Sequence, residues 1–219
     1  ASVKYIVLYA LFEMFIPWTL ISDGQRSVSS GLAGLLIATV PIWANLLAAL
    51  AGDRSVRHPR QAFGIAIGFI GVVALVGIDS LMESHDLIAM LKILFSAFSY
   101  AFATFMAMRH LGGVAGVTVN GLAMALTAVV FFIPALRTAP TSMPSNRALF
   151  ALLALGLLCT ALAFYLFFTL LRMIGPPKAS TVTYPNTAIA IALGVIILHE
   201  PITVGMVLGF PLVLLGSYL

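Results

Sequence analysis

Eight long apolar stretches, separated only by short polar segments, constrain this chain more than any other feature. A bilayer core about 30 Å thick needs roughly 20 apolar residues per helical crossing, and we expect one helix from each stretch: Tyr5–Ile21, Val28–Ala51, Ala62–Ile78, Leu87–Met108, Val114–Leu136, Leu149–Leu171, Ala179–Leu198 and Thr203–Leu219. Membrane strands would instead show alternating segments of about ten residues. The chain is therefore predicted to be an all-α integral membrane protein.

Composition agrees with a lipid environment. Hydrophobic residues make up 62% of the 219 positions and charged residues only 8%, against roughly 45–50% and 25% in soluble domains. The net charge of +4 does not indicate nucleic acid, because the basic residues are scattered through loops and form no stripe. The lone Cys159 cannot form a disulfide within the chain, and its apolar surroundings predict a core thiol.

Basic residues also predict orientation, because cytoplasmic loops retain Lys and Arg. One side collects Lys4, Arg54, Arg57, Arg60, Arg109, Arg172 and Lys178, and the other only Arg26, Lys92, Arg137 and Arg147. We therefore expect a multi-pass protein of the cell inner (plasma) membrane, with the start of the chain on the cytoplasmic side.

A weak internal repeat is visible in the sequence. Pro41, Gly64 and Gly71 recur at offsets of 144 to 145 residues as Pro185, Gly209 and Gly216. An odd number of predicted helices separates the copies, so the second copy crosses in the opposite sense, as in inverted-repeat transporters. Residues 1–78 would hold the last three helices of the first repeat and residues 87–219 the five helices of the second. We expect eight of ten helices to be present, with the first two missing.

At this point the chain resembles the drug/metabolite transporter superfamily, specifically its EamA-type members with ten helices in two five-helix repeats. The resemblance covers nearly the whole chain and rests on the order of many short patterns: Pro17-Trp18-Thr19-Leu20, Gly24-Gln25-Arg26, Val28-Ser29-Ser30-Gly31-Leu32-Ala33, Thr39-Val40-Pro41, Gly64…Gly68…Gly71, Ala161-Leu162-Ala163-Phe164-Tyr165, Gly175-Pro176-Pro177-Lys178-Ala179-Ser180, Tyr184-Pro185 and Leu198-His199-Glu200-Pro201. The acid after the Pro-bearing helix is Glu200 in the second repeat, whereas the first has Asp53-Arg54 in a longer basic loop.

The resemblance implies a central substrate cavity and alternating access, often with export of amino acids, nucleosides or toxic compounds. It implies no single substrate. No cofactor or metal is expected, and the expected partners are a small-molecule substrate, the lipid bilayer and a proton as coupling ion.

Glu13 is the acid that lies deepest within an apolar stretch, eight residues past Tyr5. Burying a charge at the centre of a membrane helix costs about 2.5–3.5 kcal/mol on insertion scales, so such a group normally faces a cavity, a partner or a proton path. The alternative is a protonated acid that hydrogen-bonds a neighbouring helix.

Two prolines predict helix breaks in corresponding helices, at Pro41 and Pro185, and paired breaks of this kind point toward a binding site. Polar and aromatic residues within the apolar stretches complete the candidate substrate-binding set: Glu13, Trp18, Trp43, Asn45, Tyr100, Asn120, Tyr165, Thr169, Tyr184 and Asn186. The amides could equally bond the carbonyls that the prolines release, or another helix. Trp18 could instead anchor the helix at the membrane interface.

Small residues four apart, at Gly64 and Gly68 and at Gly205 and Gly209, allow close approach of helix backbones. They could pack within the chain or form a homodimer.

Other function classes find little support in the sequence. His199-Glu200 has no second histidine at the spacing of a zinc protease, and no G-x-S-x-G elbow or P-loop occurs. The protein is not expected to be an enzyme. An intramembrane enzyme, a passive channel and a scaffold remain as alternatives, although neither a channel nor a scaffold predicts an inverted duplication with matched prolines.

Overall fold

The computed structural model describes residues 2–52, 59–82, 87–138, 143–174 and 183–218, and all regular structure in these ranges is helical. Five helices are long and apolar enough to cross a membrane: Val3–Gly24, Ser30–Leu50, Leu87–His110, Gly116–Arg137 and Asn146–Phe167. Three shorter apolar helices cover Ala62–Val76, Asn186–Leu198 and Val204–Gly216. These eight apolar helices correspond to the eight expected stretches, so the prediction of a multi-pass helical membrane protein is confirmed.

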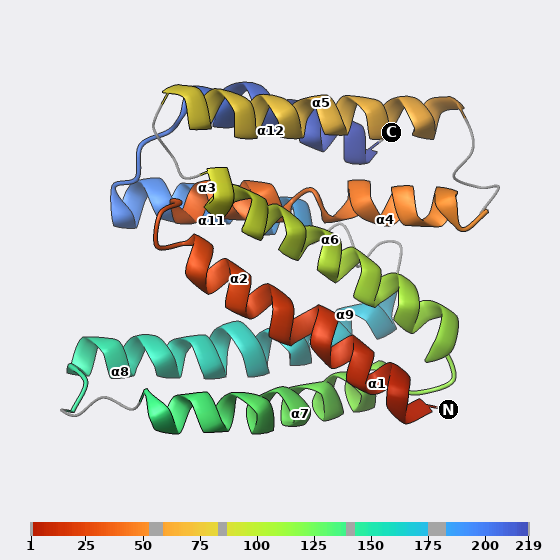
Figure 1. The fold of residues 1–219 in the computed structure, drawn as a ribbon, viewed down its shortest axis with the longest axis vertical. Coiled ribbons are helices and arrows are strands. Elements are labelled where there is room, and N and C mark those ends of the chain that lie inside the picture. The colour runs from red at the N-terminus through yellow and green to blue at the C-terminus, as the bar shows by residue number, and fades with distance from the viewer. Residues whose placement is uncertain (1, 53–58, 83–86, 139–142, 175–182, 219) are drawn as a thin grey trace. The chain divides into compact units, whose positions relative to one another are not determined.

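The chain divides into two compact units, residues 1–113 with 183–219, and residues 114–182. The first unit contains most of the helices (Figure 1): α1 (Ser2–Ala10), the π-helical segment η1 (Leu11–Phe15), α2 (Ile16–Gly24), α3 (Ser30–Ile37), α4 (Val40–Leu50), α5 (Pro59–Met82), α6 (Leu87–His110), α11 (Thr183–Leu198) and α12 (Val204–Tyr218). The last two helices of the sequence thus pack with the first half of the chain.

The second unit consists of α7 (Gly116–Arg137) and of one long helix with a π-helical middle, which comprises α8 (Asn146–Leu153), η3 (Ala154–Leu162) and α9 (Ala163–Ile174). Cys159 lies in η3 and is exposed, so the prediction of a core thiol is wrong. The reason is physical: a helix in lipid can be apolar on its outer face as well as its inner one, so an apolar stretch does not distinguish core from surface.

Glycines allow α5 and α12 to lie directly against each other in the first unit (Figure 1). A Cβ atom added to Gly71 would come within 3.0 Å of the Gly209 carbonyl oxygen, and one added to Gly216 would come within 2.6 Å of the Gly64 carbonyl oxygen. Contacts between early residues of α5 and late residues of α12 show that the two helices run antiparallel. The predicted small-residue faces are therefore used within the chain.

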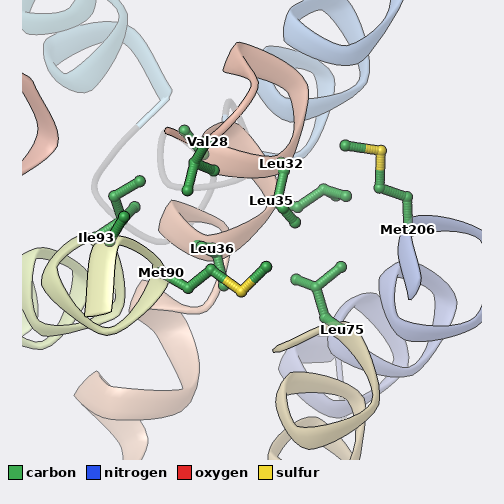
Figure 2. Close-up of a cluster of buried hydrophobic side chains, with 10 residues drawn as sticks. Val28, Leu32, Leu35, Leu36, Leu75, Met90, Ile93 and Met206 are labelled. Carbon is green, nitrogen blue, oxygen red and sulfur yellow. The ribbon is translucent and has the colours of Figure 1, made fainter. Parts of the chain in front are cut away.

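The apolar core of the first unit lies where α3, α5, α6 and α12 meet. Figure 2 shows its side chains pointing toward one another: Val28, Leu32, Leu35, Leu36, Leu75, Met90, Ile93 and Met206. Because every one of these residues is at most 5% exposed, the core fixes the start of α3 against the start of α6. A second cluster, with Ile42 and Val213, joins α4 to α12.

The span from Ser30 to Leu50 is interrupted between Ile37 and Val40, and Pro41 lies in the first turn of α4. A proline at that point loses no helical hydrogen bond, because the first N–H groups of a helix have no intrahelical partner. Thr39 donates its hydroxyl proton to the Leu36 carbonyl at 2.6 Å. The break is therefore stabilised within the chain itself.

Candidate functional site

Glu13 lies in η1, a π-helical segment in the middle of the first span. The extra residue in a π-turn displaces the helix ladder, and such segments often occur at functional sites. One carboxyl oxygen of Glu13, Oε2, is buried and has no hydrogen-bond partner. A buried oxygen without a partner is costly, so this atom is available to a bound proton or cation.

Two tyrosines lie near this carboxyl group. Tyr9 precedes Glu13 by one helical turn, and Tyr100 approaches from α6; the hydroxyl groups of both interact electrostatically with Glu13. Tyr100 also lies beside Trp18, which is 39% exposed. Ser99, next to Tyr100, donates to the Phe12 carbonyl at 2.7 Å and fixes α6 against η1. Three of the predicted site residues, Glu13, Trp18 and Tyr100, are thereby brought together.

Trp43 belongs to a different group, in which aromatic rings connect α4 to α5 and α6. Its ring meets Phe69 edge-on at a centroid distance of 5.0 Å and Phe98 edge-on at 5.6 Å. The indole Nε1 is buried and has no hydrogen-bond acceptor. Buried tryptophans usually find a partner for this N–H, so Trp43 presents an unused donor.

A cavity of about 520 Å³ lies between α4 and α6, toward the carboxyl ends of both helices. Small and apolar residues form most of its wall, and Thr104 and Arg109 contribute polar groups: Ala44, Ala48, Ala51, Gly52, Ala101, Thr104, Phe105, Met108 and Arg109. The guanidinium of Arg109 lies 5.1 Å from the centre of the Phe105 ring. The volume is in the range of sites for small organic molecules.

At the opposite end of the Ser30–Leu50 span, near the start of α6, Glu200 caps the start of α3. Its Oε1 accepts from the backbone N–H and the hydroxyl of Ser30, both at 2.8 Å, and its Oε2 accepts from the N–H of Gly31 at 2.9 Å. Burial alone would raise the pKa of Glu200, but the hydrogen bonds from Gly31 and Ser30 outweigh it and hold the pKa below the ordinary value of 4.5. The carboxyl group is therefore ionised at neutral pH.

The second unit has a cavity of its own, of about 430 Å³, between α7 and the η3–α9 helix. It brings together three predicted site residues, Asn120, Tyr165 and Thr169. Asn120 is 5% exposed and its Oδ1 has no partner. Thr169 uses its hydroxyl to donate to the Tyr165 carbonyl at 2.8 Å. Asn120 therefore offers this cavity a buried acceptor that is free to bind a hydrogen-bond donor.

The remaining predicted residues are dispersed. Asn45 is half-buried in α4, and Asn186 is exposed in α11. Pro185 lies in the first turn of α11, as Pro41 does in α4. The side chains of Tyr184 and Pro185 lie outside the described residues.

Sequence reasoning missed the bond between Glu200 and α3. Each half was visible, since Ser29-Ser30-Gly31 is a good helix start and Glu200 follows a helix end. The pairing of two segments 170 residues apart had no local signal. The two π-helical segments were also missed, because their composition is that of an ordinary apolar helix.

Comparison with known proteins gives one consistent result. The profile described as the EamA-like transporter family matches residues 1–77 and 87–219. The chain is 24% identical over 219 residues to an uncharacterized transporter of Bacillus subtilis, covering 99% of this chain and 74% of that protein. It is 27% identical over 172 residues to an uncharacterized inner membrane transporter of Escherichia coli, covering 78% of this chain and 55% of that protein. An uncharacterized transporter of Archaeoglobus fulgidus is 24% identical over 210 residues. No solved structure gives a significant match.

Proposed function

Because the chain belongs to the EamA-like transporter family, we propose that this membrane transporter is a secondary exporter that carries a small metabolite or drug-like compound across the inner membrane by alternating access. The compound would be an amino acid, a nucleoside or an amphipathic molecule. In this mechanism two repeats move against each other about a site near the middle of the bilayer.

The packing of α5 against α12 supports two inverted repeats. Gly71 contacts Gly209, and Gly64 contacts Gly216. Adding the repeat offset of 145 residues to Gly71 gives Gly216, and subtracting it from Gly209 gives Gly64. If each glycine is replaced by its counterpart in the other repeat, the Gly71–Gly209 contact becomes the Gly216–Gly64 contact. Such a pair of equivalent contacts is expected for antiparallel helices related by a twofold axis. Because these glycines are used within the chain, a homodimer would need another surface.

The single observation that carries the site is the unpartnered Oε2 of Glu13 in the middle of a span. A carboxyl group at this depth persists only where it has a task or a partner. The hydroxyl groups of Tyr9 and Tyr100 nearby can orient a proton or the ammonium group of a substrate. We assign Glu13 as the group that binds the coupling proton or a cationic substrate.

Flux through the reconstituted protein tests this function. Vesicles would be screened with labelled amino acids, nucleosides and cationic dyes, with and without a pH gradient. Glu13→Gln should abolish uptake driven by the gradient, because the amide cannot ionise. Asp23→Asn is the matched control: it makes the same chemical change in an exposed acid of the same span and should leave uptake unchanged.

Exchange of labelled for unlabelled substrate, without a gradient, then separates the two roles. Exchange should survive Glu13→Gln if the carboxyl group binds only the proton, and it should be lost if the group binds the substrate. Gradient-driven uptake equal to wild type in a folded Glu13→Gln protein would overturn the assignment. Absence of saturable flux for every class of compound would argue against the transport function itself.

A further inference from the structure

We propose that Glu200 is a latch: by binding the start of α3, its carboxylate holds one membrane face of the first unit closed, and this contact breaks when the protein opens to that face. The charge pattern of the sequence predicts that this is the outer face. The proposal rests on alternating access as the proposed function and adds the residue that controls it.

The latch satisfies backbone groups that would otherwise be unpaired. The first N–H groups of a helix have no intrahelical acceptor and carry a partial positive charge. In α3, Glu200 accepts from the N–H groups of Ser30 and Gly31, and the Ser29 hydroxyl accepts from that of Leu32 at 3.3 Å. Because the Ser30 hydroxyl donates as well, both oxygens of the carboxylate are occupied.

The turn that contains His199 and Glu200 places the carboxylate at the start of α3. α11 ends at Leu198, His199 adopts a positive φ of 55°, and the N–H of Glu200 returns to the Gly194 carbonyl at 3.1 Å. A Cβ atom on Gly194 would lie 2.6 Å from Oε2 of Glu200. A larger residue at position 194 would therefore displace the carboxylate from α3. The positive φ of His199 shows that the turn is held in an uncommon conformation.

The contact connects parts of the chain that belong to different proposed repeats. α3 lies in the first, and α11, Glu200 and α12 lie in the second. Below the latch, α3 and α11 touch directly, with a Cβ on Gly34 placed 3.3 Å from that of Ala190. Movement of one repeat away from the other at this face must therefore break the three hydrogen bonds to Glu200.

The two ends of the first unit differ in packing: one is closed and the other has a cavity, as expected for an alternating-access transporter in one of its two states. At the latch end, the apolar cluster around Leu32 and Met206 fills the space between the helices (Figure 2), and Lys92 pairs with Asp23 at 2.6 Å. At the opposite end of α4 and α6 lies the cavity of about 520 Å³ that includes Ala48 and Arg109. One end is closed and the other is hollow.

Cysteine accessibility tests the latch without requiring a known substrate. In a Cys159→Ala background, Ala48→Cys reports on the cavity and Ala190→Cys on the contact beneath the latch. Two preparations of sealed vesicles, one right-side-out and one inside-out, would each be treated with a membrane-impermeant maleimide. We expect Glu200→Gln to raise outer labelling of the Ala190→Cys protein by about 5- to 30-fold, equivalent to about 1–2 kcal/mol in the equilibrium, and to lower inner labelling of the Ala48→Cys protein.

Two further variants make the test specific. Asp23→Asn removes the exposed ion pair with Lys92 at the same end and should raise outer labelling much less than Glu200→Gln does, because an exposed pair contributes little. Ser30→Ala removes one of the three hydrogen bonds and should raise outer labelling less than Glu200→Gln does; it also provides the test if the Gln variant fails to fold. A folded Glu200→Gln protein with unchanged rates, or with equal rises at both faces, would overturn the latch. Opening of the outer face in a protein without flux would support the latch and count against the transport function.

Discussion

Gly71→Ala is the substitution whose cost can be worked out most directly from the packing of α5 against α12. The new Cβ atom would lie 2.8 Å from the Leu212 Cβ and 2.8 Å from the Val213 backbone nitrogen. A backbone atom cannot shift without the rest of its helix, so α5 and α12 must move apart. Overpacking of this kind costs about 1–3 kcal/mol, and the better helix propensity of alanine returns about 0.5–1 kcal/mol. The two terms together give a net loss of about 0–2.5 kcal/mol, with about 1 kcal/mol at the middle of the range.

Gly121→Ala is the matched control, because Gly121 is also inside a helix and a Cβ there would meet no atom within 4 Å. This variant should gain about 0.5–1 kcal/mol from propensity alone. Unfolding in mixed detergent micelles, followed by circular dichroism, would compare the two free energies. Gly216→Ala should resemble Gly71→Ala, because the proposed repeat exchange relates these two positions. Equal stability of the Gly71→Ala and Gly121→Ala proteins would refute the close packing of α5 and α12.

Two other outcomes follow from the described contacts. Because the pKa of Glu200 is held below 4.5, its contribution to the free energy of unfolding should be constant from about pH 8 to about pH 5 and be lost as the pH falls further. Unfolding titrations should therefore show the stability difference between wild type and Glu200→Gln shrinking below about pH 5. A stability difference that disappears above pH 5 would contradict the hydrogen bonds to Glu200. Asn120→Leu removes a buried oxygen that has no partner, so the free energy of unfolding should stay equal or rise by about 1 kcal/mol. Substrate flux should fall if the amide binds substrate. A clear loss of stability would show that Asn120 has a structural partner.

Sequence reasoning predicted the helices well because hydrocarbon permits few alternatives. The stretch predicted as Leu87–Met108 is the helix Leu87–His110, and Val114–Leu136 is Gly116–Arg137. The resemblance to EamA-type transporters is confirmed by the family profile. In both cases the information is local: length, apolarity and the order of short patterns are properties of the sequence itself.

Long-range pairings could not be read in the same way. Glu13 was singled out by its depth, and its unpartnered oxygen fits that reasoning, but its nearness to Tyr100 depends on how α6 crosses η1. Glu200 was noticed only as part of a helix end, because a carboxylate in a loop gives no indication of which helix it will cap. The exposure of Cys159 has the same origin, since lipid and protein core select the same residues.

Labelling from the two sides of the membrane tests the inverted repeat, on which the whole account depends. Leu50 and Leu198 end the Pro-bearing helices of the two proposed repeats, and both are exposed. In a Cys159→Ala background, an impermeant maleimide should reach the Leu50→Cys protein only from the cytoplasmic side and the Leu198→Cys protein only from the outer side. Labelling of both variants from the same side would contradict the inverted arrangement.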